Sequence, residues 1–306
     1  MNPSNASRTA LATSLMRALH THSDPAPLLN DPWGDRLVPE AVRAALCERV
    51  LAGMDPVKRA EAATMPDQVL DAALRGNAAY ADVILRARYT EDALESAVKR
   101  GVSQYVIVGA GFDSFICRRP DWAQTLAVYE IDHPATLDLK RRRLAECSIL
   151  DSVYTELVDA DLSIEDLGSA LTRSSFDPDR TTFFSWLGVT MYLTRKANLA
   201  TLKAIASCAP AGSELVFTYV DEAALVPGYQ GDVSFQRLKE EVSAAGEAFL
   251  SGFDPSALEE LLLEVGLLLM EDLSGHRAVG RYDAAATNGL RSADAAHFAH
   301  VRVVGS

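Results

Sequence analysis

The sequence lacks the features that mark several classes of protein. No run of about eighteen apolar residues occurs, so we expect no membrane-spanning helix. The four cysteines stand apart without a CxxC pair, so neither a zinc or other metal site nor a disulfide framework is expected. Lys and Arg number 29 against 42 Asp and Glu, and the net charge of −13 disfavours nucleic acid and anionic membranes as partners.

Enough apolar material is present for one large folded core. The chain has 306 residues, of which 48% are hydrophobic. Polar and charged residues occur too early at the N-terminus for a secretory signal, so we expect a cytoplasmic protein. The oligomeric state stays open between monomer and dimer.

The first part of the chain has the pattern of a helical region. Apolar spacing predicts helices over residues 7–20, 39–53 and 65–74, with Ser7 as a cap for the first. A longer helix over 78–100 ends at Gly101. We expect residues 1–79 to form a helical cover on a core made by residues 80–306, the whole being one compact unit.

Strands and helices alternate in the core, which is typical of a mostly parallel α/β sheet. Strands are predicted at 104–108, 126–131, 153–158, 182–186 and 214–219. Helices are predicted around Phe115, over 134–147 and over 194–208. A helical insertion over 221–252, a helix over 255–265 and strands at 267–273 and 298–304 follow.

A glycine turn follows the first strand, and acids end the second. Gly109-Ala110-Gly111 comes directly after an apolar run, and Glu130-Ile131-Asp132 closes the next strand about twenty residues later. This spacing indicates a nucleoside-containing cofactor whose ribose a carboxylate binds. Glu130 and Asp132 point to the same side of a strand, so the pattern does not separate them.

The residues after the glycine turn bear on which cofactor is bound. A dinucleotide fingerprint has a third glycine where this chain has Ser114. Asp113 would repel a pyrophosphate but suits a sulfonium. We therefore favour S-adenosylmethionine (SAM) over a nicotinamide dinucleotide.

Further candidates lie at the other strand ends and upstream. Asp161 and Leu162 follow the third strand, where they could bind adenine. Gly188 and Tyr192 lie past the fourth strand and could line a pocket. Arg86, or its neighbour Arg88, could hold a cofactor carboxylate by a two-point contact.

Ordered motifs give the chain a family resemblance over nearly its whole length. They are SRTALATSLMRALH, NDPWGDRL, GAGFDS, YEIDHP, DADL, FFSWLGVTMYLT, ELVFTYV, GFDP, GHRAVGRYD and AHVRVV. Together they resemble the leucine carboxyl methyltransferase-like family of SAM-dependent methyltransferases, most of all its bacterial branch of small-molecule O-methyltransferases. The resemblance implies a Rossmann-like class I methyltransferase fold: a seven-stranded, mostly parallel sheet with an N-terminal helical cover and an inserted lid over 221–252.

The resemblance also implies roles for individual residues. Arg86 matches the arginine that holds the methionine carboxylate, with Arg88 as the nearby alternative. Asp132 matches the ribose-binding acid, with Glu130 beside it. The other implied cofactor contacts are Gly109, Ala110, Gly111 and Asp113 beside the methionine part, and Asp161 and Leu162 at the adenine.

One position departs from the pattern of some eukaryotic members. Leu187 stands where those members have a Glu that touches the cofactor or substrate region. A leucine accepts no hydrogen bond, which weakens the case for methylation of a protein C-terminal leucine. We keep Leu187 and Gly188 as cofactor-side candidates.

The sequence thus predicts a SAM-dependent O-methyltransferase that releases S-adenosylhomocysteine (SAH). The expected acceptor is a carboxylate or hydroxyl of a small metabolite, with polyketide-like molecules among the candidates. Tyr192, His20 and Tyr219 are candidate substrate contacts, and no catalytic base is assigned. The alternatives are a protein C-terminal carboxyl methyltransferase, a nicotinamide-dependent oxidoreductase and a SAM-binding protein without catalysis.

Overall fold

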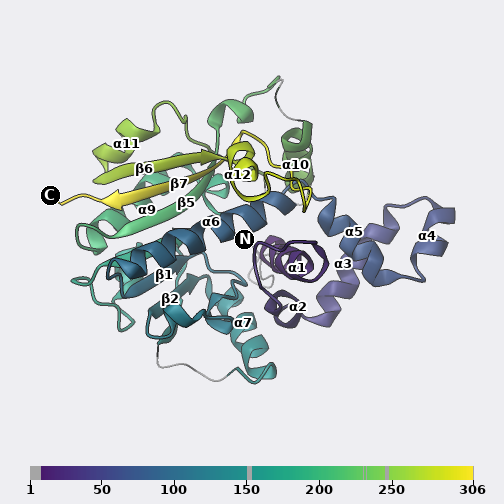
Figure 1. Cartoon of the computed structure of the whole chain (residues 1–306), viewed down its shortest axis with the longest axis horizontal. Coiled ribbons are helices and arrows are strands. Elements are labelled where there is room, and N and C mark those ends of the chain that lie inside the picture. Colours follow the sequence, from purple (N-terminus) through teal and green to yellow (C-terminus); the bar gives the residue numbers. More distant parts are fainter. Residues whose placement is uncertain (1–7, 150–153, 230, 232, 245–247, 306) are drawn as a thin grey trace.

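A seven-stranded sheet forms the centre of the molecule (Figure 1). The computed structural model describes residues 8–149, 154–229, 231, 233–244 and 248–305. The strand order is β3-β2-β1-β4-β5-β7-β6. The parallel part consists of β1 (Gln104–Val108), β2 (Ala127–Asp132), β3 (Thr155–Asp159), β4 (Thr182–Trp186) and β5 (Glu214–Val220).

The last two strands complete the sheet in the opposite sense. β7 (Ala296–Val303) runs antiparallel to β5 and to β6 (Leu267–Ser274). The predicted sheet, seven-stranded and mostly parallel, is confirmed. The predicted strands agree with the observed ones within a few residues, except that part of the range 153–158 lies outside the described residues.

The central strands are buried on both faces, which explains why most of their residues are apolar or aromatic. Every residue of β1, β4 and β5 is buried. Alternate residues enter separate cores, because Tyr105 and Ile107 belong to one buried cluster and Val106 and Val108 to another. The central strands are thereby held by side chains on both sides.

The described residues before β1 are mostly helical, and the predicted division into a cover of residues 1–79 and a core of residues 80–306 stays a prediction. α1 (Arg8–Ser23) packs on α6 (Tyr80–Lys99), the long helix expected over 78–100. The others are α2 (Trp33–Leu37), α3 (Glu40–Ala52), α4 (Pro56–Ala62) and α5 (Pro66–Arg75). The sequence did not predict α2 and α4, which are short. Figure 1 shows α4 at the end of the region farthest from the sheet.

The remaining helices connect or flank the strands. They are α7 (Pro134–Glu146), α8 (Leu167–Leu171), α9 (Arg195–Cys208), α10 (Val233–Ala244), α11 (Leu258–Glu264) and α12 (Gly275–Tyr282). α7, α9 and α11 confirm predicted helices, whereas α8 and α12 were not predicted. The expected cap Ser7 and parts of the expected insertion over 221–252 lie outside the described residues.

The helix predicted around Phe115 is wrong. Two short 3-10 turns, Phe115–Cys117 and Asp121–Ala123, connect β1 to β2 instead. Pro120 stands between them and cannot continue a helix. The glycine turn is therefore not followed by the N-terminus of an α-helix.

No helix in the described ranges is long and apolar enough to cross a membrane.

Glu214 begins β5 at the edge of the sheet opposite the glycine turn. Its buried carboxylate accepts hydrogen bonds from Arg100 Nη2 at 2.7 and 2.8 Å and from Arg302 Nη2 at 3.1 Å. His300 Nε2 lies 2.9 Å away. Burial opposes ionisation, but the hydrogen bonds from His300 and Arg100 outweigh it and lower the pKa of Glu214 to about 2.

We predict that Glu214 carries part of the acid stability of the fold. A pKa below the unfolded value stabilises the protein above about pH 4.5, and this contribution is lost as pH falls toward 2. Glu214→Gln should lower the free energy of unfolding by about 2–3 kcal/mol at pH 7. In this variant the free energy of unfolding should also fall less steeply between about pH 4.5 and pH 2 than in the native protein. Urea titrations across this range measure both effects. Glu40→Gln, at an exposed carboxylate, should change neither.

Candidate functional site

The candidate residues gather where the strand order of the sheet reverses. β1 lies between β2 and β4, so the chain leaves β1 and β4 toward opposite sides. Ligands of open α/β sheets bind outside the carboxyl ends of strands at such a switch point. Gly109 follows β1 and Leu187 follows β4, which places both at this edge.

The glycine turn is bonded to the end of β2. The N–H groups of Gly109 and Ala110 donate to the carbonyl of Ile131 at 2.8 and 3.0 Å, and Gly111 N–H donates to Asp132 Oδ2 at 2.6 Å. Gly109 and Gly111 have φ of 70° and 52°, a region that favours glycine. All three N–H groups are thus used within the protein.

Asp132 joins the turn to the start of α7. Its Oδ1 accepts from His133 N–H at 2.7 Å, while Oδ2 holds Gly111. Burial raises the pKa of Asp132, although these two backbone hydrogen bonds oppose the rise. Each carboxylate oxygen has a second lone pair, so Asp132 can still accept ribose hydroxyls.

Glu130, the other acid of this strand, has a different partner. Its side chain is fully buried and pairs with the equally buried Lys140 of α7. Burial raises the pKa of Glu130 to about 7, with Lys140 opposing the rise. The structure therefore separates the two acids that the sequence left together: Glu130 supports the strand from inside, and Asp132 holds the turn.

Arg86 lies on α6 facing the loop after β4. Its guanidinium makes no hydrogen bond or ion pair within the described part of the chain, whereas Arg88 pairs with Asp92. A Cβ built on Gly188 would lie 2.5 Å from Arg86 Nη1, so a side chain at this position would displace the guanidinium. Burial and the nearby Arg17 lower the pKa of Arg86 to about 10, which keeps it charged at neutral pH.

The loop after β4 completes this side of the site. Gly188 N–H donates to Thr218 Oγ1 at 2.7 Å, which fixes the loop to β5. Leu187 is partly buried against the core that includes α6. Tyr192 follows in a 3-10 turn, contributes to the electrostatic environment of Arg86, and has its ring centroid 5.6 Å from that of Phe249.

Asp113, Asp161 and Leu162 extend the site on either side of Asp132. Asp113 accepts from Phe115 N–H at 2.7 Å and adds negative charge near Arg86. Asp161 accepts from the Ser163 hydroxyl at 2.6 Å and from its N–H at 3.0 Å, and these bonds lower the pKa of Asp161. Leu162 packs on the core beside it.

Two candidate substrate contacts are not supported. His20 is fully buried, pairs with Asp24 and accepts from Leu28 N–H at 2.7 Å. Tyr219 is also buried, donates to Asp272 Oδ2 at 2.8 Å and stacks on His297. Neither ring has a free polar atom turned toward the edge of the sheet.

Sequence reasoning missed one network of polar residues under the turn. Arg17 Nε donates to Asp31 Oδ2 at 2.8 Å, and the Ser114 hydroxyl donates to the same oxygen at 2.6 Å. The signals were present, since Asp31 lies in the NDPWGDRL motif and Ser114 replaces the third glycine. Motif matching alone did not show that the two meet.

Two hollows lie outside this set of residues. The larger, about 490 Å³, lies between α3, α4 and α5 and contains none of the predicted cofactor residues. The smaller, about 20 Å³, lies between the start of α6, α10 and residues 291–293. Asp82 lines it one helical turn before Arg86, which places this hollow beside the site.

Comparisons with known proteins find relatives along most of the chain. The model of the leucine carboxyl methyltransferase family matches residues 10–206. YktD of Bacillus subtilis, named "Putative S-adenosyl-L-methionine-dependent methyltransferase", is 29% identical over 277 residues, or 90% of each chain. A Mycobacterium avium protein named in the same way is 30% identical over 248 residues, covering 80% of this chain and 74% of that protein.

A solved structure shares the fold. The crystal structure of a duf574 family protein from Streptomyces avermitilis matches with a TM-score of 0.56 at 19% identity. The match covers 86% of this chain and 97% of that chain. At this identity the likeness concerns the fold alone.

We predict that Gly188 is needed for the position of Arg86. Gly188→Ala should lower the free energy of unfolding by about 2–3 kcal/mol, because the new Cβ strains a positive φ and meets the guanidinium. Gly212→Ala is the matched control: φ is also positive there, but no atom lies within 4 Å, so about 1 kcal/mol is expected. Urea unfolding measures the free energy of unfolding of both variants. Equal losses would contradict the prediction that a Cβ at Gly188 crowds Arg86.

Proposed function

The chain belongs to the leucine carboxyl methyltransferase family and is a SAM-dependent methyltransferase, and we propose that it methylates an oxygen atom of a small molecule. The observation that carries the cofactor site is the Arg86 guanidinium, which lies against Gly188 at the switch point of the sheet and has no hydrogen-bond or ion-pair partner among the described residues. A charged donor without a partner suits a carboxylate ligand.

The residues present fit this cofactor. In the proposal, Arg86 holds the methionine carboxylate and Asp132 accepts the ribose hydroxyls. The turn at 109–111 and Asp113 lie beside the methionine chain, and Asp161 and Leu162 lie at the adenine. Leu187 and Gly188 border the methyl group from the β4 side. Glu130 has no direct contact in this arrangement.

SAM supplies a methyl group on a positively charged sulfur. When bound, it would supply this methyl group to an acceptor oxygen, and the electron pair of the broken carbon–sulfur bond would remain on the sulfur of SAH. The protein contributes alignment and exclusion of water. A hydroxyl acceptor must also lose a proton, whereas a carboxylate has none to lose.

The surroundings of the six histidines are compatible with a carboxylate acceptor. Four of the six histidines lie against carboxylates: His20 with Asp24, His22 with Asp35, His297 with Asp272, and His300 with Glu214. His133 caps α7 near Asp161, at the proposed adenine end, and the sixth, His276, is exposed on α12. A carboxylate needs no general base, which agrees with this arrangement.

We place the acceptor at the smaller hollow beside Arg86. Arg291 lines it, is exposed and has no ion pair in the described ranges, so it can attract an anionic acceptor, although the Asp82 carboxylate, which accepts from the Ser292 hydroxyl, lines the same hollow and opposes this attraction. Phe235 of α10 closes the hollow on the other side. A volume of about 20 Å³ holds little more than one water molecule, so binding requires α10 to move aside as a lid.

The other candidate functions have less support. A dinucleotide needs free turn N–H groups and the N-terminus of a helix, and here β2 uses those groups and 3-10 turns replace the helix. Methylation of a protein C-terminus remains the second candidate, weakened by Leu187. We expect the chain to act in the cytoplasm, where its four free cysteines would stay reduced.

Arg86→Ala should weaken SAH binding by about 1.5–3 kcal/mol, because a charge-assisted contact to the carboxylate is lost. Isothermal titration calorimetry measures the affinity. Arg88→Ala is the matched control, since this neighbouring arginine is already paired with Asp92, and its affinity should equal that of the native protein. The reverse result would assign the carboxylate to Arg88, and no binding of SAM or SAH by the native protein would refute the cofactor site.

A screen with methyl-labelled SAM should show transfer to small carboxylic acids. Alkali releases methanol from a methyl ester but not from a methyl ether, so volatile label after mild base identifies the carboxyl product. Phenols and alcohols form the second arm, and peptides with a C-terminal leucine form the third. Label confined to the peptide arm would contradict the small-molecule proposal, and alkali-stable label would contradict carboxyl transfer.

A further inference from the structure

We infer that Asp31, in the N-terminal helical cover, is a positioning residue for the cofactor turn, acting through Ser114 and Arg17. Asp31 is fully buried between α1 and the turn. Its Oδ2 accepts from Arg17 Nε at 2.8 Å and from the Ser114 hydroxyl at 2.6 Å. The carboxylate thus joins a helix of the cover to the loop that follows Gly109-Ala110-Gly111.

Arg17 makes a second connection to the same loop. Its Nη2 donates to the carbonyl of Phe112 at 2.7 Å, while its Nε is held by Asp31. A guanidinium has donors in a fixed planar fork and can make both contacts at once. Phe112 directly follows Gly111, whose N–H holds Asp132, so Asp31 and Asp132 fix the turn from opposite sides.

The network continues to the helix that carries Arg86. Ser114 accepts a hydrogen bond from Arg118 Nε at 3.0 Å, and Arg118 pairs with Glu91 of α6. Glu91 lies five residues after Arg86 on this helix. Through Ser114, Asp31 therefore connects the cover, the turn and the arginine proposed to hold the cofactor carboxylate.

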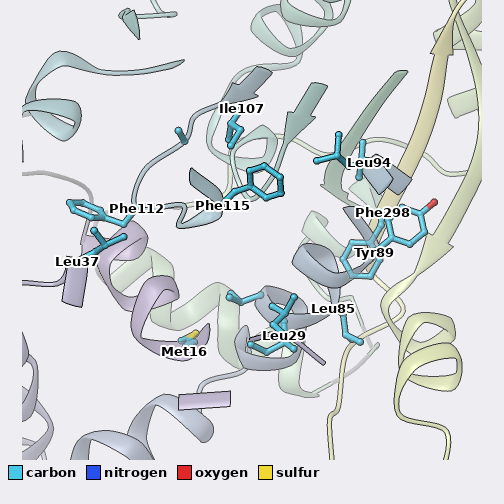
Figure 2. Packing of buried hydrophobic residues seen from close by; sticks show 14 of the residues in the cluster. Met16, Leu29, Leu37, Leu85, Tyr89, Leu94, Ile107, Phe112, Phe115 and Phe298 are labelled. Carbon is cyan, nitrogen blue, oxygen red and sulfur yellow. The ribbon is translucent and has the colours of Figure 1, made fainter. Parts of the chain in front are cut away.

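Apolar packing reinforces the same contact. Phe112 and Leu37 are buried in one cluster, and Figure 2 shows them beside each other, Leu37 coming from the cover. A Cβ built on Gly111 would lie 3.0 Å from the Cβ of Ala10 in α1. The cover therefore packs directly on the turn and is part of the cofactor site.

Charge gives Asp31 a second effect on the site. Among the charged groups near Arg86, Arg17 has the largest effect: its positive charge repels that of Arg86 and lowers the pKa of Arg86. Asp31 compensates Arg17, so its loss would leave two guanidinium groups close together with less neutralising charge. Burial favours protonation of Asp31, but Arg17 and Arg118 outweigh it and hold the pKa of Asp31 below its usual value.

The test compares SAH affinity with stability in three variants. Asp31→Asn should weaken SAH binding about tenfold, and Ser114→Ala, which removes one hydrogen bond, about threefold. Glu214→Gln is the control, because it breaks another buried ion-pair network at the far edge of the sheet and should leave the affinity unchanged. Calorimetry is done well below each unfolding temperature, and circular dichroism verifies folding.

Amide hydrogen exchange gives a readout that stability alone would not move. Because coupling between sites is reciprocal, SAH should slow exchange in α1 of the native protein but much less in Ser114→Ala. Exchange in α11, remote from the turn, should be unaffected.

The outcomes separate this inference from the proposed function, on which it rests. If the native protein binds no SAH, the proposed cofactor site fails. If the native protein binds SAH and both Asp31→Asn and Ser114→Ala bind it within twofold of native affinity, the positioning role of Asp31 is refuted. If Asp31→Asn does not fold, Ser114→Ala alone tests the inference. A Ser114→Ala variant that binds SAH with native affinity, and whose exchange in α1 slows as much as in the native protein when SAH binds, would refute it.

Discussion

The hydrogen bond from Gly111 N–H to Asp132 is the contact on which the candidate site depends. It brings the end of β1 to the end of β2 and fixes the carboxylate at the switch point of the sheet. It also uses an N–H group that a phosphate-binding loop would present to its ligand. The turn therefore presents a tight backbone and the Asp132 carboxylate to a bound molecule, but no free N–H group. The positive charge of the site comes from Arg86 on α6.

Strands and long helices could be predicted because the spacing of their apolar residues in the local sequence indicates which residues are buried. Residues 104–108 and 182–186 are mostly apolar or aromatic, and the observed strands have those bounds. The segment around Phe115 has similar apolar content, but Pro120 limits it to 3-10 turns. The short helix α2 has no side-chain cap and is held by packing on α1, which no local pattern contains, whereas the cap of α8, Asp166, was a local signal that the prediction did not use.

Motifs identified the region of the site but not the partners of its residues. Glu130 and Asp132 are equivalent by strand periodicity, and only the position of Lys140 on α7 separates them. Arg86 and Arg88 are likewise neighbours on one helix, and the pairing of Arg88 with Asp92 distinguishes them. His20 was a reasonable polar candidate in the cover, but Asp24, one helical turn away, holds it in the interior.

The contact between the cover and the glycine turn has a consequence for how the chain folds. Arg17 and Phe112 are 95 residues apart in sequence, and Asp31 and Ser114 are 83 apart. During synthesis, α1 leaves the ribosome long before the loop that it must pack against exists. Closing such long loops costs entropy, but the sheet has a similar cost, because β1 pairs with β4 over 78 residues at Gln104 and Thr182. The cover and the sheet should therefore form as one cooperative unit. Opening of these contacts would free the glycine turn together with α1, so a chain that has lost its cover should also have lost its binding site for the cofactor.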